Sequence, residues 1–146
     1  MQSTSSVPTQ DRKDCIILAI PAGEGLFEVS AGMKEMNIPL CIVQGMCEIE
    51  EALSNNLGVL GVVVAQKFLG DDTARAVESI RNIDSELPIV VVASDTNIAF
   101  EITMRQMGIF YYLLSPYDRE EFFNIVQALH YHNARRSKVR KVGGSN

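Results

Sequence analysis

The stretch "LGVVVAQKF", residues 60–68, lies near the middle of this 146-residue chain. Its first six residues are apolar without alternation, which is typical of a strand buried on both faces of a parallel sheet. Gln66 and Lys67 then mark the place where the strand runs out into a loop. In parallel α/β proteins the ligand site lies at the carboxyl ends of the strands. The stretch therefore raises the question of what a strand does when it brings only an alanine and a glutamine to that edge.

The same kind of apolar run recurs on both sides of this stretch and alternates with segments of helical spacing. The other four strands are predicted at residues 15–20, 39–44, 89–94 and 110–114. The intervening helices are predicted from apolar stripes, which comprise Leu26, Val29, Met33 and Met36; Ile49 and Leu53; Ala76, Val77, Ile80 and Ile83; and Ile98, Ile102 and Met107. The last helix is predicted over "REEFFNIVQALHYH", residues 119–132.

Residues that end or begin helices support these assignments. Asn37 and Pro39 suit the end of the first helix, and Gly108 suits a C-terminal cap. The candidate N-terminal caps are Asp71 or Asp72, then Asp95 or Thr96, and finally Asp118, which forms a capping box with Glu121.

Five strands that alternate with five helices specify βαβ units and a parallel sheet. We therefore predict a flavodoxin-like (βα)5 three-layer sandwich, in which a five-stranded parallel sheet has the order 2-1-3-4-5. Residues 14–132 are expected to form this single domain. Residues 1–13, which are polar and rich in serine and threonine, are expected to be a disordered lead, and residues 133–146 a basic flexible tail.

Composition narrows the class of protein further. The net charge of −5 and the pI near 5.0 argue against nucleic-acid binding by the whole surface. The three cysteines include no C-x-x-C pair and suit reduced thiols in a cytoplasmic protein. The first residues lack the apolar core of a secretory signal, and no apolar run approaches the ~20 residues of a membrane-spanning helix. We expect no membrane association.

The polar residues near the strand ends do not form a recognisable catalytic or metal-binding set. Gly23 and Gly25 are read as a tight turn, because Glu28 stands where a dinucleotide-binding fingerprint has its third glycine. His130 and His132 are two apart on a predicted helix, so they point in different directions and cannot share a metal ion. We therefore expect no cofactor, no metal ion and no enzymatic activity.

The last third of the chain carries a family resemblance. "LPIVVVASDTNIAFEITMRQMGIFYYLLSPYDREEF", residues 87–122, resembles the C-terminal half of a response-regulator receiver domain of the CheY-like family. The spacing from Leu87-Pro88, which opens strand four, to Ser115-Pro116-Tyr117, which follows strand five, fits without a gap. A weaker likeness extends over residues 14–132.

The resemblance implies where a receiver would keep its reactive residues. These are two acidic residues that hold Mg²⁺, an aspartate that accepts the phosphoryl group, a threonine or serine, a lysine, and an aromatic switch residue. The corresponding positions here are, in order, Pro21 and Ala22, Gln66, Ala93, Ser115 and Tyr112. A shift of one residue would place Ser94 at the threonine position.

Gln66 is neutral and has no ionised oxygen, so it cannot accept a phosphoryl group in the way an aspartate does. Without carboxylates at Pro21 and Ala22, Mg²⁺ lacks ligands, and without a lysine at Ser115, nothing offsets a phosphoryl charge. The resemblance together with these replacements predicts a pseudo-receiver, a degenerate member of two-component signalling, which acts by protein–protein interaction without aspartyl phosphorylation.

Receivers usually contact partners through helix four, strand five and helix five. The matching positions are Glu101, Arg105, Tyr112, Asn124 and Ala128, and this face would bind a protein partner or a second copy of the chain. A simpler interpretation of Glu101 and Arg105 is a solvated i,i+4 ion pair.

Two other classes of function stay open. Polar groups of Gln66, Ser94, Asp95 and Ser115 would form a small-molecule pocket at the strand edge. Alternatively, the cations of the tail would contact nucleic-acid phosphates; they are Arg135, Arg136, Lys138, Arg140 and Lys141.

Overall fold

The computed structural model describes residues 15–21, 26–55, 58–94, 96–115 and 117–144, and the side chains among them except those of 26–29 and 133–144. The lead predicted for residues 1–13 lies outside these ranges, as do Ala22 and Asp95. The strands are β1 (Cys15–Ala19), β2 (Leu40–Ile42), β3 (Val59–Ala65), β4 (Ile89–Ala93) and β5 (Tyr111–Leu114). The helices are α2 (Leu26–Glu35), α3 (Met46–Asn55), α4 (Gln66–Leu69), the 3₁₀ turn η2 (Gly70–Asp72), α5 (Thr73–Ile83), α6 (Ile98–Gln106) and α7 (Arg119–Gly144).

The five strands form one parallel sheet in the order β2-β1-β3-β4-β5, which confirms the predicted fold class and topology. β3 lies at the centre and pairs with β1 on one side and with β4 on the other. From Leu60 to Ala65 every residue of β3 is buried, as the unbroken apolar run predicts. The carboxyl end of β3 therefore reaches the edge of the sheet between the ends of β1 and β4.

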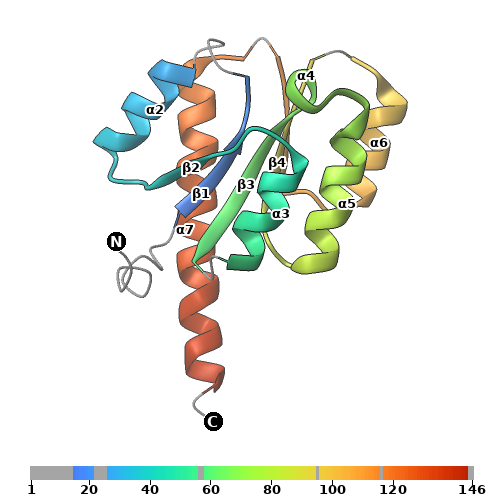
Figure 1. Cartoon of the computed structure of the whole chain (residues 1–146). Coiled ribbons are helices and arrows are strands. Elements are labelled where there is room, and N and C mark those ends of the chain that lie inside the picture. Colours follow the sequence, from blue (N-terminus) through green and yellow to red (C-terminus); the bar gives the residue numbers. More distant parts are fainter. Residues whose placement is uncertain (1–14, 22–25, 56–57, 95, 116, 145–146) are drawn as a thin grey trace, which may run out of the picture.

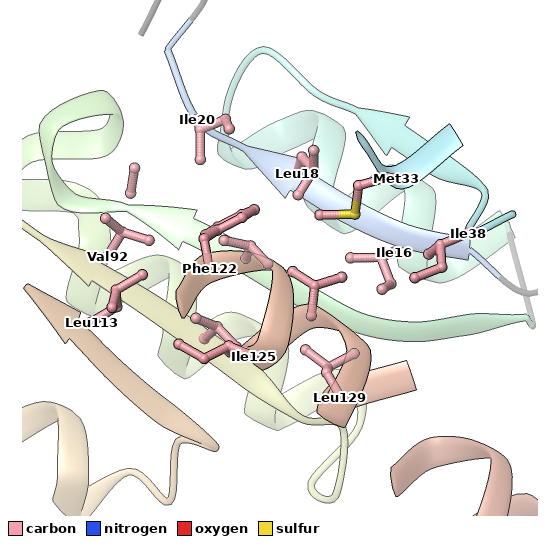
Figure 2. Packing of buried hydrophobic residues seen from close by; sticks show 14 of the residues in the cluster. Ile16, Leu18, Ile20, Met33, Ile38, Val92, Leu113, Phe122, Ile125 and Leu129 are labelled. Atoms are coloured by element: carbon pink, nitrogen blue, oxygen red, sulfur yellow. The ribbon is translucent and has the colours of Figure 1, made fainter. Parts of the chain in front are cut away.

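Helices cover both faces of the sheet (Figure 1). On one face, α2 and α7 pack over the sheet, and Figure 2 shows Phe122, Ile125 and Leu129 of α7 within this cluster of buried side chains. On the other face, α3, α5 and α6 supply Ile49, Val77 and other buried residues to a second cluster. The molecule is thus the predicted three-layer sandwich with two apolar layers.

Gly61 explains how closely α7 approaches the sheet. A Cβ atom at this position would lie 2.3 Å from Cδ2 and 2.8 Å from Cγ of Leu129, which is itself fully buried. A glycine inside a strand often marks such a close approach. The unbroken apolar run around Gly61 did not indicate this contact.

The segment after β3 differs from the predicted loop. Gln66–Leu69 forms a helical turn, α4, and η2 continues it directly into α5. The predicted cap by Asp71 or Asp72 is wrong, since neither η2 nor α5 has a side-chain cap at its start. The backbone is already helical there, so the first N–H groups of α5 do not depend on a side chain. The Thr73 hydroxyl instead donates to the carbonyl of Gly70.

The inward face of α6 also differs from the prediction. Met104 is buried, and Phe100 and Met107 pack against the same cluster, whereas Ile98 and Ile102 are exposed. Residues 100, 104 and 107 follow the i, i+4, i+7 spacing of one helical face, so the helix offers two apolar rows and buries the longer one. The cap of α6 is Asn97, whose side chain accepts from the Phe100 N–H at 3.0 Å, instead of Asp95 or Thr96. Ile83, at the last position of α5, is exposed as well.

The last helix extends further than predicted. Instead of ending at His132, α7 continues to Gly144 and projects past the sheet (Figure 1). The flexible tail predicted for residues 133–146 is therefore helical over 133–144. No proline stands in this segment, and its first glycine is Gly143, so no strong helix breaker interrupts the helix before its end. Within the described residues, no helix is both long and apolar enough to cross a membrane.

Candidate functional site

The carboxyl edge of the sheet is organised around Gln66. It follows the buried, extended Ala65 and begins α4, so its backbone turns away from the sheet at once. The backbone carbonyl of Gln66 accepts from the N–H of Gly70, and the positive φ of 59° at Gly70, which glycine adopts readily, ends the turn. The half-buried side chain of Gln66 stays at the sheet edge.

The Gln66 side chain bonds directly to the end of β4. Its Oε1 atom accepts from the backbone N–H of Ser94 at 2.8 Å and from the Ser94 hydroxyl at 3.2 Å. Ala93, the predicted counterpart of the receiver threonine, is fully buried and offers only a methyl group. The residue that interacts with the acceptor position is therefore Ser94, the neighbour that a shift of one residue would select.

Two other predicted receiver positions, Ser115 and Pro21, lie at the same edge of the sheet, and no side-chain hydrogen bond to Gln66 is seen for them in the described residues. Ser115 is half-buried, and its backbone N–H donates to the carbonyl of Ala93 at 2.7 Å. Pro21 is half-buried just after β1, and its neighbour Ala22 lies outside the described residues. The structure thus brings Gln66 and Ser94 into contact and places Ser115 one strand further along.

The charged groups singled out in the sequence do not form a metal centre. Among the residues that the structure describes, no group of three histidine, cysteine or acidic side chains could hold a metal ion. Asp71 and Asp72 are exposed on η2, and Asp72 lies 3.5 Å from the guanidinium of Arg75. The ring of His132 packs against Phe110 with 5.4 Å between ring centroids.

A second feature is the exposed apolar surface on α6 and β5. Three side chains make up this α6–β5 surface, with exposed fractions of 70% for Ile98, 51% for Ile102 and 42% for Leu114. Tyr111 is 41% exposed but lies on the other side of β5, where its hydroxyl donates to Glu121 of α7 at 3.4 Å. β5 is an edge strand of the sheet, so nothing within the sheet covers its outer side. Apolar side chains that gather on one surface are a usual sign of a binding site.

Polar residues beside this surface fix α6 against β5. Arg105 donates to Glu101 at 2.9 Å, and its guanidinium lies 5.5 Å from the centre of the Tyr112 ring. Tyr112 is half-buried with its hydroxyl buried, and its ring packs 6.3 Å from that of Phe100. The solvated ion pair expected for Glu101 and Arg105 is present, and Arg105 also connects α6 to Tyr112.

The interaction face predicted from the resemblance coincides only in part with the exposed apolar α6–β5 surface. Glu101, Arg105 and Tyr112 are brought together, while Asn124 and Ala128 are exposed on α7, which covers the other face of the sheet. The apolar residues Ile98 and Ile102 were missed, because they were assigned to the core. The row formed by residues 100, 104 and 107 was the signal in the sequence that could have reversed this assignment.

Comparisons with known proteins identify the fold. No family model matches the chain, and no curated protein matches it either. Among solved structures, it is similar to the signal receiver domain of a putative LuxO repressor protein from Vibrio parahaemolyticus, with a TM-score of 0.76 and 9% identity over 87% of this chain and 97% of that one. It is also similar to the receiver domain of an HD-domain protein from Pseudomonas fluorescens, with a TM-score of 0.75 and 14% identity over 94% and 97% of the two chains.

A third similar structure is the receiver domain of a sensor histidine kinase from Pseudomonas aeruginosa, which holds a coordinated magnesium ion in its active-site cleft. The TM-score is 0.67, with 16% identity over 81% of this chain and 98% of that one. All three likenesses show the fold, which is the fold of CheY-like receiver domains of two-component signalling proteins.

Proposed function

We propose that this chain is a pseudo-receiver, a receiver-fold domain that acts by protein–protein interaction and is not phosphorylated on an aspartate. The observation that carries this proposal is the pair formed by Gln66 and Ser94 at the carboxyl ends of β3 and β4. At the place where the resemblance expects the phosphoryl acceptor, an amide oxygen already accepts two hydrogen bonds from the neighbouring strand end.

The chemistry of the edge supports this proposal. An amide has no ionised oxygen to attack a phosphoryl donor, and Ala93 and Ser115 supply no charge to bind one. The five receiver positions are all neutral here, and such a set is consistent within itself. A lysine is needed among them only when clustered carboxylates or a phosphoryl group must be neutralised.

The α6–β5 surface supports the interaction part of the proposal. Ile98 and Ile102 lie one turn apart on the exposed side of α6, and Arg105 lies one turn further along the same side. A row of apolar residues bordered by an ion pair fits a partner surface with an apolar centre and a polar rim. The partner is a second protein or a second copy of this chain.

Binding of a small molecule at the strand edge is less well supported. The Gln66 oxygen and both Ser94 donors satisfy one another, so a ligand would have to break these bonds before it could use them.

Two measurements test the proposal. Incubation with acetyl phosphate and Mg²⁺ should leave the intact mass unchanged, and a phosphoryl adduct would overturn the claim that the domain is not phosphorylated.

The second measurement tests the interaction: proteins retained by the immobilised wild-type chain should be lost with the double variant Ile98→Gln, Ile102→Gln. They should be kept by Ile83→Gln, because Ile83 is equally apolar and 45% exposed but lies on α5. Equal losses with both variants would show that the α6–β5 surface is not the docking site.

A further inference from the structure

The pairing between β3 and β4 has a regular period that reaches Gln66. The N–H of Val62 donates to the carbonyl of Pro88 at 3.0 Å, and the register pairs Val62 with Ile89 and Ala65 with Val92. In a parallel ladder, every second residue of one strand bonds to the two residues that flank its partner on the next strand. Val62 lies opposite Ile89, between residues 88 and 90 of β4. The same two-residue period places Gln66 opposite residue 93, between residues 92 and 94.

The Gln66 side chain makes the bond that the backbone of the strand would otherwise make. If β3 continued, the backbone carbonyl of Gln66 would accept from the N–H of Ser94. Because the chain turns into α4, that carbonyl accepts from Gly70 instead. The side-chain oxygen takes its place and accepts from the Ser94 N–H at 2.8 Å and from its hydroxyl at 3.2 Å. The amide of Gln66 thus extends the β3–β4 ladder by one rung after the backbone of β3 has left it.

The end of β4 leads directly to the α6–β5 surface. Asn97, three residues after Ser94, caps α6, and the next residue is the exposed Ile98. Further along α6, Phe100 and Arg105 contact the ring of Tyr112 on β5. Ser94 thus lies three residues before the cap of α6, and Phe100 and Arg105 hold α6 against Tyr112.

We propose that Gln66 is a built-in tether, which holds α6 and the α6–β5 surface in the docking arrangement permanently and without any covalent modification. This inference rests on the proposed function, since it supplies the regulation of the same surface. It goes beyond the loss of an acceptor, because it gives the glutamine a positive role that depends on its length and its carbonyl oxygen.

Three variants of Gln66 separate the requirement for the length of the side chain from the requirement for its carbonyl oxygen. Gln66→Glu keeps an acceptor oxygen at the same reach, Gln66→Asn keeps the amide but is one methylene shorter, and Gln66→Leu has a similar size without an acceptor. Backbone amide signals of β3 and β4 would show that each variant is folded.

The experiment is an NMR comparison of the full chain in the four forms. It measures amide hydrogen exchange at Ser94, together with the methyl shifts and relaxation dispersion of Ile98 and Ile102. With Gln66→Asn and Gln66→Leu, exchange at Ser94 should rise by roughly fivefold, the factor that corresponds to one net hydrogen bond. New exchange broadening should appear at both isoleucines. Wild type and Gln66→Glu should show neither change.

Two results would overturn the inference. If Gln66→Leu accelerates exchange at Ser94 but leaves the isoleucine methyls unchanged, the bond is local and does not control the surface. If the wild-type methyls are already broadened, α6 is not held in one arrangement. A phosphoryl adduct on the wild-type chain would instead refute the proposed function, and the Gln66 series would still decide whether the tether exists.

Discussion

At the scale of single residues, the side chain that matters most for the site is Gln66, and the one that matters most for packing is Gly61. Gln66 marks the strand end in the sequence, but its bond to Ser94 could not be predicted, because it depends on the turn into α4. Gly61 lets α7 lie close against β3, and a methyl group there would meet three atoms of the Leu129 side chain at 2.3–2.8 Å.

Replacing Gly61 with valine should therefore destabilise the fold. Leu129 is fully buried and cannot move away freely, so overpacking should lower the free energy of unfolding by about 1–3 kcal/mol. Urea denaturation would measure this. Gly45→Val is the matched control, because a Cβ there meets nothing within 4 Å. Combining Gly61→Val with Leu129→Ala should recover part of the loss, and equal costs for Gly61→Val and Gly45→Val would contradict the account.

The cysteines should differ in reactivity. Burial, with a smaller contribution from the nearby carboxylate of Glu48, raises the pKa of the Cys41 thiol. A raised pKa leaves less of the nucleophilic thiolate at any pH below it, while Cys47 is exposed. A thiol reagent at neutral pH should label Cys47 before Cys41, and raising the pH should narrow the difference. Peptide mapping would check the order, and prior labelling of Cys41 would contradict it.

At the scale of elements, the apolar pattern of the sequence predicted the five strands, their order and most of the helices correctly. It failed where two interpretations of a pattern competed. α6 has two apolar rows, and the wrong one was assigned to the core. The predicted caps of α5 and α6 were also wrong, because backbone geometry serves at α5 and Asn97 serves at α6. At the start of α7, by contrast, the predicted Asp118 does accept from the N–H of Glu120 at 3.4 Å. Local sequence cannot decide such cases, because the choice depends on which row meets the sheet.

Arg81 is a tertiary link between elements that the sequence did not indicate. From the last turn of α5, its guanidinium donates to the carbonyls of Met107 at 3.0 Å, Gly108 at 2.7 Å and Leu87 at 2.6 Å. It thereby satisfies the end of α6 and the start of β4 with one rigid, charged group.

Removing the guanidinium of Arg81 should destabilise the fold. Arg81→Ala should lower the free energy of unfolding by about 2–3 kcal/mol, since charge-assisted hydrogen bonds are lost and the carbonyls of Met107, Gly108 and Leu87 lose their donor. Arg81→Lys should recover little of it, because an ammonium cannot reproduce the fork. Arg75→Ala, which removes only an exposed ion pair with Asp72, should change stability by less than about 0.5 kcal/mol in the same denaturation series. Equal effects at both arginines would refute the role of Arg81.

At the scale of the whole molecule, two apolar layers enclose one sheet, and the fold is that of receiver domains (Figure 1). The described residues of α7 that enter the core are Phe122, Ile125, Val126 and Leu129, all before the extension that projects past the sheet. The fold could be predicted from the sequence because it depends on repeated patterns, whereas the site depends on single contacts across the sheet edge.

A chain shortened to end at His132 should therefore keep its stability. Circular dichroism should show a lower helix content, in proportion to the residues removed, and an unchanged midpoint of thermal unfolding. A chain that ends at Glu121 should not fold, because it lacks Phe122 and the rest of that apolar row. A large drop in the midpoint for the His132 form would show that the extension supports the domain.

The central claim is that the domain works without phosphorylation, and the most direct test is an amide NMR titration of the full chain with Mg²⁺ and beryllofluoride, a mimic of an aspartyl phosphate. The account predicts no change at Gln66, Ser94 or Tyr112. Specific, saturable shifts at these three residues would mean that a working anion and metal site exists at the strand edge, and they would contradict the account.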